Sequence, residues 1–273
     1  MEKPASLPWF GRCGVRLLNL HPIPRHVAFI MASFWTHDGN RRYARAHQLS
    51  SVVDGHAKGF DQLIRVVEWS IELGIQEVTV YAFSLENFKR SDDEVEGLQK
   101  LAKDKFTYLL KSKQLEAIGV RIRFFGNKNR FTEEVRKTMN DVEETTKKVS
   151  TVRFTNFAST TNVFSGNVNI CVAYTSQDEI ARGMQNIQAQ VLRGELKPSQ
   201  IDGTVFGNVL DTRDSLPVDV VIRTSGEKRL SDFLLWQSSN AFIHFDDVFW
   251  PDFNFWHFFK AIFAYQIHMI KQK

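Results

Sequence analysis

Residues 60–83 read FDQLIRVVEWSIELGIQEVTVYAF, and this stretch decides the fold class. Its first part repeats apolar residues at the spacing of one helix face, namely Phe60, Leu63, Ile64, Val67 and Ile71. Gly74 is placed to end that helix, and residues 78–83 (VTVYAF) then form a β-rich run. A helix followed closely by a buried strand is the building unit of an α/β protein.

The same alternation continues on both sides of this stretch. Residues 26–31 (HVAFIM) are typical of a buried strand, and further strands are predicted at 120–125, 168–173, 218–222 and 242–245. Helical spacing and helix-start signals predict helices from 91 to 109, from 132 to 142, from 180 to 191 and from 255 to 270. The pattern predicts a single α/β domain with a mostly parallel sheet of about six strands covered by helices.

The composition is that of a globular chain with an excess of aromatic residues. Of 273 residues, 43% are hydrophobic and 24% are charged, so the chain can bury a full core. Lys and Arg outnumber Asp and Glu by 35 to 31. This mild excess allows an anionic partner but argues against a nucleic-acid-binding module, which needs a strongly basic face. The 23 Phe and 6 Trp residues indicate either an aromatic core or an apolar cavity.

The N-terminus and the cysteines bear on the cellular setting. Cys13 and Cys171 are too few for a disulfide framework or a zinc site. We expect no transmembrane helix and no secretory signal, and therefore a reducing, cytosol-facing location. Residues 7–20 (LPWFGRCGVRLLNL) suit either an amphipathic helix on a membrane surface or a terminal helix packed on the domain. We therefore divide the chain into an N-terminal amphipathic segment, 1–21, and a catalytic domain, 22–273.

The residues that follow the first strand suit a phosphate ligand. Residues 38–42 read DGNRR, and the planar forks of Arg41 and Arg42 match phosphate oxygens. Gly39 allows the backbone to approach a ligand, and Asp38 beside two arginines is a natural Mg²⁺ ligand. Taken alone, the same motif also fits a turn with solvated arginines.

Two more loops with phosphate-compatible donors follow later strands. Residues 84–90 (SLENFKR) carry a hydroxyl, an amide and two cations, although a helix-capping loop fits them equally. Residues 223–231 (RTSGEKRLS) place two arginines and two serines around one glycine. Three such loops at one sheet edge indicate more than one phosphate group. Because the chain lacks both the P-loop and the G-x-G-x-x-G fingerprint, we predict a diphosphate joined to an apolar tail rather than a nucleotide.

At this point the chain resembles a known family. HVAFIM and DGNRR, with GHAKGF, VTVYAFSLENFKRS, VVIRTSGEKRLSDFLLWQ and VFWPDF, are together similar to the cis-prenyltransferases over residues 22–270. Within that family the chain most resembles the eukaryotic dehydrodolichyl diphosphate synthase type of catalytic subunit rather than the bacterial undecaprenyl diphosphate synthases. The resemblance implies that isopentenyl diphosphate units are added in cis geometry to farnesyl diphosphate. It also implies a hydrophobic tunnel for the growing chain.

The resemblance also assigns the site residue by residue. Asp38 would hold Mg²⁺ against the allylic diphosphate, which Gly39, Asn40, Arg41, Arg42 and Arg90 would surround. Arg223, Arg229 and Ser231 would bind isopentenyl diphosphate, and Ser84 and Asn87 would line the junction. Among these we predict Asp38, Asn40, Ser84 and Asn87 as catalytic, together with His56. The role of His56 is open between orientation or proton handling and a plain hydrogen bond within the fold.

The chain also departs from the family pattern. Residues 32–37 (ASFWTH) separate the first strand from DGNRR, and residues 156–168 interrupt the approach to the fourth strand. Val52 stands where many relatives carry an arginine, and Phe242 stands where bacterial relatives have a metal-binding glutamate. The insertions leave open a catalytically impaired isoform or a non-catalytic partner subunit of the same fold. The retained arginines and Asp38 argue against a non-catalytic subunit.

The end of the chain bears on a partner. Residues 265–273 (YQIHMIKQK) lack the R-x-G tail of single-subunit bacterial enzymes. The resemblance therefore implies a Nogo-B receptor-like accessory subunit that contributes this motif and a membrane anchor. It places the chain peripherally on the cytosolic face of the endoplasmic reticulum membrane, where its product would serve dolichol and protein glycosylation. The aromatic residues of 253–259 suit either a partner or this chain's own sheet.

Overall fold

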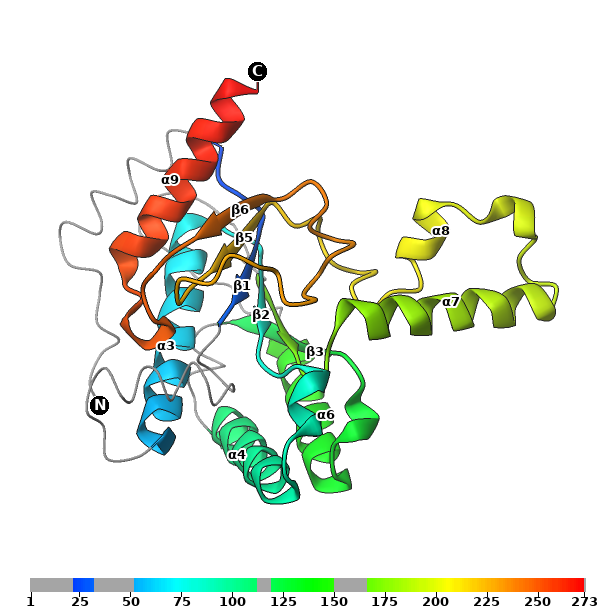
Figure 1. The fold of residues 1–273 in the computed structure, drawn as a ribbon, viewed down its shortest axis with the longest axis horizontal. Coiled ribbons are helices and arrows are strands. Elements are labelled where there is room, and N and C mark those ends of the chain that lie inside the picture. The colour runs from blue at the N-terminus through cyan, green and yellow to red at the C-terminus, as the bar shows by residue number, and fades with distance from the viewer. Residues whose placement is uncertain (1–21, 32–51, 112–118, 150–165, 273) are drawn as a thin grey trace.

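A computed structural model of the chain describes residues 22–31, 52–111, 119–149 and 166–272 (Figure 1). Its centre is a six-stranded sheet in the order β3-β4-β2-β1-β5-β6. The strands are β1 (His26–Ile30), β2 (Glu77–Tyr81), β3 (Val120–Phe125), β4 (Gly166–Cys171), β5 (Val220–Arg223) and β6 (Phe242–Phe245). All five pairings are parallel, which confirms the predicted α/β class and the mostly parallel sheet.

Four of the five longer helices cover one face of this sheet. The longer ones are α3 (Val52–Leu73), α4 (Asp92–Lys111), α6 (Glu133–Val149), α7 (Ser176–Leu192) and α9 (Phe255–Lys271). The short ones are η1 (Leu85–Lys89), η2 (Lys128–Arg130), η3 (Pro198–Gln200), α8 (Gly203–Gly207) and η4 (Trp250–Asp252). Side chains from α3, α4, α6 and α9 share one buried cluster with β-strand residues such as Phe29, Val80 and Ile122. The sequence pattern predicted these helices because their apolar stripes repeat at 3.6-residue spacing.

The opposite face is covered mainly by an irregular segment. Tyr81 of β2 stacks on Phe233 with ring centroids 4.7 Å apart, and both rings contact Tyr174 edge-on. Phe233 and Leu234 are fully buried here. The backbone amide of Leu235 donates to the Ser176 hydroxyl at the start of α7. The loop after β5 therefore continues across the sheet and holds the base of α7.

The bounds of four strands differ from the sequence prediction: β1 ends one residue earlier, and β5 begins and ends later. β2 and β4 both begin and end earlier than expected, because an apolar run reports burial and not the extent of the hydrogen-bonded ladder. As a correction, residues 166–168 belong to β4 and not to an insertion. Gly166 and Asn167 lack the apolar signature of a buried strand, yet they pair with Val120 and Arg121 of β3. The remainder of the predicted insertion, 156–165, lies outside the described residues, as do 32–37 and 1–21.

A buried polar layer crosses four strands at the amino end of the sheet. Arg123 donates to Glu77 at 2.7 Å and to Asn169 at 2.8 Å, and Asn169 donates to Thr79 at 2.8 Å. His26 completes the layer through Thr79 at 2.7 Å. Three of these side chains, Thr79, Arg123 and Asn169, stand between apolar neighbours on their strands. Sequence patterning therefore did not reveal the layer.

The tautomer of His26 follows from its two partners. Its Nδ1 lies 2.8 Å from the carbonyl oxygen of Leu216, which can only accept, so Nδ1 carries the proton. Its Nε2 then accepts from the Thr79 hydroxyl, and the ring is neutral. Burial lowers the pKa of His26, against the opposing charge of Glu77.

We expect the free energy of unfolding to fall as the pH drops below about 6.5, since the unfolded His26 then binds a proton that the folded ring excludes. A His26→Asn variant should be less stable at pH 7.5 and should lose part of this pH dependence. Denaturant unfolding at pH 7.5 and pH 5.5 measures both effects. Equal pH dependence in the two proteins would show that other groups carry it, with His244 the next candidate because burial also lowers its pKa.

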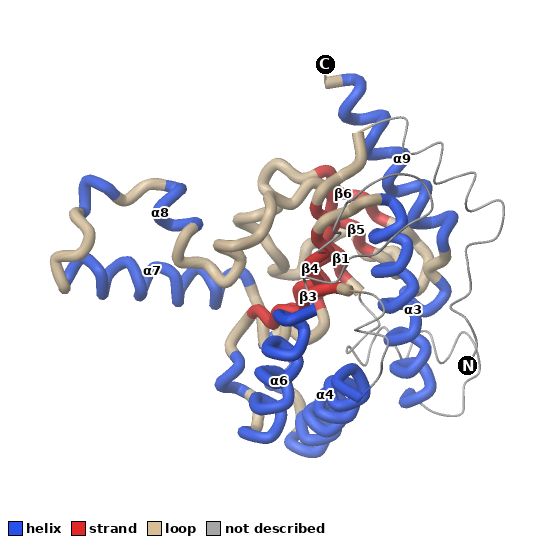
Figure 2. Tube along the Cα trace, turned by 180° about the vertical axis from the view of Figure 1, so that it is seen from behind, coloured by secondary structure: helices blue, strands red, loops and turns tan. Residues whose placement is uncertain are grey.

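An arm formed by α7 and α8 extends beyond the sheet, as both views show (Figures 1 and 2). Ile187, Phe206 and Leu210 form its own small apolar cluster, separate from the main core. Arg182 holds the base of the arm through a bidentate pair with Asp211 at 2.7 and 2.9 Å. The arm is therefore stabilised locally and not by burial against the sheet.

The aromatic C-terminal segment is mostly core. Phe253, Phe255 and Phe258 are buried, and Phe253 and Phe258 both contact Phe29 of β1. These three rings therefore pack on this chain's own sheet and are not available to a partner. Trp256 is 55% exposed and lies on the outer side of α9. None of the helices in the described part of the chain combines the length and hydropathy needed to cross a bilayer.

Candidate diphosphate site

The strand order places the predicted loops at one edge of the sheet. β2, β1 and β5 are neighbours and parallel, so the segments after their carboxyl ends lie together. The backbone amide of Thr224, directly after β5, donates to the carbonyl of Ile30 at the end of β1. The loop that follows β1 lies outside the described residues, and with it Asp38, Gly39, Asn40, Arg41 and Arg42. The side chain of His56 and that of Val52, both on α3, are also outside the described part, so these assignments stay predictions.

The structure brings the three predicted residues of the β5 loop together around one guanidinium. Arg223, the last residue of β5, is 3% exposed. Its Nη1 donates to the Ser231 hydroxyl at 2.7 Å and to the backbone carbonyl of Arg229. A buried arginine that also orders its loop is suited to present a fixed fork to a diphosphate.

Arg229 itself points to the surface. Its side chain is 61% exposed and forms an ion pair with Glu227. The loop therefore offers one buried and one exposed arginine, which is an arrangement the sequence did not distinguish. An exposed arginine paired with a carboxylate can exchange that partner for a diphosphate at small cost, because surface ion pairs contribute little.

The backbone of this loop adopts left-handed conformations at non-glycine residues. Ser225, Ser231, Asp232 and Leu234 have φ values of 75°, 50°, 58° and 47°. Such residues are uncommon and persist where the surrounding structure holds them. They mark residues 225–234 as the most conformationally constrained loop of the described chain.

Two further hydroxyls of this loop were absent from the predicted site. Thr224 and Ser225 are 0% and 4% exposed, and within the described residues neither hydroxyl oxygen has a hydrogen-bond partner. Unpaired buried hydroxyls are unfavourable unless a ligand meets them. The only sequence signal was their position between Arg223 and Gly226 in RTSG.

The loop after β2 uses its predicted residues for local capping. The Ser84 amide donates to the Asn87 side-chain oxygen at 2.9 Å, and the Ser84 hydroxyl accepts from the Glu86 amide at 3.2 Å. This reciprocal cap starts η1, and Arg90 follows directly at its end. The helix-capping alternative is therefore correct for these side chains, while the backbone still places all three at the carboxyl edge.

The β2 and β5 loops lie close enough to influence each other electrostatically. Burial raises the pKa of the Asp232 carboxyl, and the nearby charge of Glu86 raises it further. Burial likewise raises the pKa of the Tyr81 hydroxyl, with smaller contributions from both carboxylates. Glu86 and Asp232, more than 140 positions apart in the chain, are thus near neighbours, as expected from the adjacent positions of the loops at the sheet edge.

The donor set at this edge fits a diphosphate with Mg²⁺. Within the described residues no cluster of three His, Cys, Asp or Glu side chains forms a metal site. Buried hydroxyls and arginines dominate instead, and Mg²⁺ at diphosphate sites often takes one carboxylate plus phosphate oxygens. Asp38 is the residue predicted to supply that carboxylate. Phe242 supplies none, since its ring packs against Tyr265 and His268 of α9.

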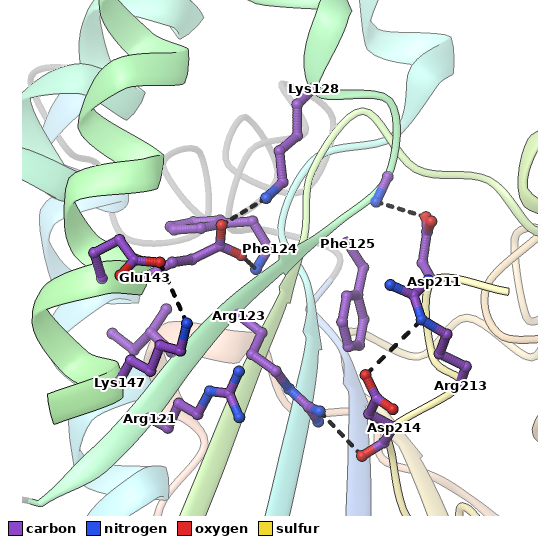
Figure 3. Close-up of a pocket in the computed structure, with 13 residues that line it drawn as sticks. Arg121, Arg123, Phe124, Phe125, Lys128, Glu143, Lys147, Asp211, Arg213 and Asp214 are labelled. Carbon is purple, nitrogen blue, oxygen red and sulfur yellow. Dashed lines mark hydrogen bonds and ion pairs between the residues drawn. The ribbon is translucent and has the colours of Figure 1, made fainter. Parts of the chain in front are cut away.

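A polar cavity of about 350 Å³ lies elsewhere, between β3, α6 and residues 211–214 (Figure 3). Several of its cations have partners, such as Lys128 with Glu143 at 2.8 Å and Arg123 with Glu77. β3 is the sheet edge opposite to β6, so this cavity is separate from the β5 loop. It is neither the predicted diphosphate site nor apolar, and the hydrophobic tunnel stays a prediction.

Comparison with known proteins identifies the family. Residues 36–272 match the family model described as "Putative undecaprenyl diphosphate synthase". The chain belongs to the cis-prenyltransferase family. The matched region contains DGNRR and every other predicted site residue.

Individual relatives agree with this assignment. The human dehydrodolichyl diphosphate synthase complex subunit is 39% identical over 273 residues, covering 99% of this chain and 76% of that protein. An undecaprenyl diphosphate synthase of Picrophilus torridus, described as specific for geranylgeranyl diphosphate, is 37% identical over 91% of this chain and 89% of its own. The solved lavandulyl diphosphate synthase of Lavandula x intermedia superposes with a TM-score of 0.75 at 26% identity, covering 89% of this chain and 95% of that one.

These matches establish the reaction class. As a cis-prenyltransferase, the chain elongates prenyl diphosphates with cis geometry. Eukaryotic and archaeal relatives match it at similar identity, so the length of the product does not follow from the family.

Proposed function

We propose that this chain is the catalytic subunit of a dehydrodolichyl diphosphate synthase. It adds isopentenyl diphosphate units to farnesyl diphosphate and forms a long polyprenyl diphosphate, the precursor of dolichol for protein glycosylation. The observation that carries the proposal is the β5 loop, where buried Arg223 gathers Ser231 and Arg229 beside two buried hydroxyls that have no hydrogen-bond partner among the described residues. The near full-length similarity to the human complex subunit supports the choice of product class. The retained loop disfavours the alternative of a non-catalytic subunit.

The residue types suit the chemistry of chain elongation. The bond between the allylic carbon and its diphosphate oxygen breaks, a carbon–carbon bond forms to the alkene of isopentenyl diphosphate, and a proton leaves to restore a double bond. Negative charge develops on the departing diphosphate, which arginines stabilise more in the transition state than in the ground state. Mg²⁺, when bound through Asp38, supplies the same stabilisation as a Lewis acid. Arg223 and Arg229 hold the diphosphate group of isopentenyl diphosphate, so that the alkene of this substrate is positioned to attack the allylic carbon.

Turnover with defined substrates tests the proposal. Isopentenyl diphosphate should be incorporated into farnesyl diphosphate to give long-chain products in the presence of Mg²⁺. Asp38→Ala should lower turnover at least about 10²-fold while leaving thermal unfolding unchanged, since it removes the predicted metal carboxylate. Asp214→Ala, at the distant polar cavity, is the matched control and should keep parental turnover. Near-parental activity of Asp38→Ala would refute the metal assignment.

The archaeal relatives favour a second candidate that the same assay separates. They are described as specific for geranylgeranyl diphosphate and form undecaprenyl diphosphate. A preference for the geranylgeranyl starter with shorter products would place this chain with them. Lack of incorporation into either starter would support the impaired isoform instead.

We further propose that the chain works with a Nogo-B receptor-like accessory subunit, which binds at the arm. The human and mouse relatives are described as subunits of a complex. On the arm and the adjoining loop, large apolar side chains are exposed: Met184, Leu192, Ile201, Leu235 and Trp236. Since the arm does not pack on the sheet, a second subunit can bury these residues without rearranging the core.

The isolated chain should turn over slowly and should gain activity severalfold when the accessory subunit is added. Met184→Asp with Leu192→Asp should prevent co-purification, because it places charges in the apolar contact. Phe263→Asp, at an exposed apolar site on α9, is the control and should leave co-purification intact. Full activity of the isolated chain, with no gain on adding the partner, would favour a self-sufficient enzyme.

The cellular placement is part of the same proposal. We place the chain peripherally on the cytosolic face of the endoplasmic reticulum membrane, with residues 1–21 as an amphipathic segment ahead of the catalytic domain, 22–273. A long polyprenyl product is itself a lipid, so an enzyme beside the bilayer can release it directly. Fractionation of cells that express the tagged chain, followed by an alkaline wash, tests peripheral against integral association.

A further inference from the structure

We propose that the outer face of α9 is a second membrane-contact surface that lies flat on an anionic bilayer. The inference builds on the peripheral membrane association proposed above. Its test measures lipid binding and does not depend on turnover. The surface consists of Trp256, Phe259, Phe263, Ile267 and Ile270, and is called the α9 stripe below.

The spacing of the α9 stripe puts its residues on one side of the helix. The intervals of three, four, four and three residues keep all five within less than a quarter of the helix circumference. Trp256, Phe263, Ile267 and Ile270 are exposed, and Phe259 is half-buried. Ring contacts of 5.8 Å and 6.0 Å join Trp256 to Phe259 and Phe259 to Phe263. Phe259 also packs against the main core cluster, so the strip meets the buried side of the helix at this residue, while its other four members are exposed.

Apart from Phe259, the core uses the other side of the helix. The inward face is complete with Phe258, Ala261, Ile262 and Tyr265, all buried in the main cluster. A surface helix normally carries polar residues on its outer face, and a contiguous exposed apolar strip of this kind marks an interaction site. Figure 2 shows α9 at the side of the molecule away from the arm, so the two apolar surfaces are separate.

The charge pattern selects a lipid surface as the occupant. α9 contains no Asp or Glu in its 17 residues, and Lys260 and Lys271 flank the exposed arc on one side. Trp and Phe beside Lys is the combination found in helices that lie in the headgroup region of anionic membranes. The neighbouring helix α3 carries Asp61, Glu68 and Glu72 among its described side chains, and burial raises the pKa of Glu68 and of Glu72.

The start of the described chain lies against the C-terminal half of α9. Gln266, buried under the C-terminal half of α9, donates from Nε2 to the carbonyl oxygen of Pro22 at 3.3 Å. The described chain thus begins beside α9. Residues 1–21, whose sequence suits a membrane surface, lie outside the described residues and precede Pro22 in the chain.

Vesicle co-sedimentation of the full chain tests the inference. The probes are vesicles of phosphatidylcholine alone and of phosphatidylcholine with phosphatidylserine. Trp256→Gln with Phe263→Gln and Ile270→Gln should weaken binding to the anionic vesicles by about 10-fold or more, because three exposed apolar side chains no longer enter the interface. Lys260→Gln with Lys271→Gln should abolish the preference for anionic over neutral vesicles. Met184→Gln with Leu192→Gln removes similar apolar surface from the arm and should leave binding unchanged.

Three results would overturn the inference. The first is parental vesicle binding by the triple variant, which would assign attachment to residues 1–21 alone. The second is equal weakening by the arm variant, which would show nonspecific hydrophobic adsorption. The third is protection of Trp256 from aqueous quenchers in the lipid-free chain, which would show that protein already covers the stripe. Turnover of soluble substrates by the triple variant, expected at the parental level, keeps this outcome separate from the proposed catalytic function.

Discussion

Replacing Arg223 with Lys is expected to lower kcat/KM for isopentenyl diphosphate by about 10²-fold or more. The guanidinium is buried and bonds Ser231 and the Arg229 carbonyl, so the loop fixes the orientation of the fork that we propose binds the diphosphate. Lysine keeps the charge but not the planar fork, and it cannot serve the loop and the substrate together. Steady-state kinetics with farnesyl diphosphate held saturating would measure the effect.

Two controls separate binding from folding in this experiment. Arg193→Lys changes an exposed arginine of the arm, paired with Glu195, and should leave kinetics at the parental level. Thermal unfolding of Arg223→Lys should show a folded protein, because the loop lies at the sheet edge and not in the main core. Unchanged kcat/KM in a folded Arg223→Lys protein would remove Arg223 from the site.

Replacing Glu77 with Gln is expected to destabilise the fold by about 3–5 kcal/mol. The Glu77 side chain is fully buried, pairs with Arg123 at 2.7 Å, and also accepts from Asn169 and from the Leu216 amide. The amide of Gln leaves the charge of Arg123 uncompensated. Its NH2 group would also face Arg123, Asn169 and the Leu216 amide, which all donate hydrogen bonds at this position. Denaturant unfolding monitored by circular dichroism would give the change in the free energy of unfolding.

Glu134→Gln is the matched control for this substitution. It breaks the ion pair with Lys103, in which the Glu134 side chain is 73% exposed, and should leave the unfolding midpoint unchanged. A Glu77→Gln protein as stable as the parent would show that water reaches the polar layer and replaces the lost charge. Equal effects of Glu77→Gln and Glu134→Gln would likewise contradict the buried pair.

The class of fold and the position of the β5 loop were accessible from local pattern. Residues 60–83 predicted a helix and a strand because apolar spacing encodes which face is buried, and the structure has α3 and β2 there. The segment RTSGEKRLS was predicted as a ligand loop because it follows a strand of a parallel sheet. Arg223, Arg229 and Ser231 are indeed gathered in it.

Other features escaped the sequence because they depend on neighbours that are distant along the chain. The polar layer of His26, Glu77 and Arg123 sits on three different strands, and its residues become partners only once β1, β2 and β3 are assembled. Similarly, whether a phenylalanine of the final segment is core or surface depends on its side of α9. Phe258 and Phe263 lie five residues apart with opposite outcomes.

By itself, the sequence determined the α/β class, the family motifs and which loops carry the arginines and hydroxyls predicted to bind phosphate, since these are set by residue type and short-range spacing. Only the tertiary structure decided that Arg223 is buried while Arg229 faces solvent, that Ser84 and Asn87 cap η1, and that α9 has an apolar outer stripe. The physical reason is that burial, ion pairing and exposure are properties of surfaces brought together by folding. The sequence gives the chemical type of each side chain, whereas the fold decides which groups surround it.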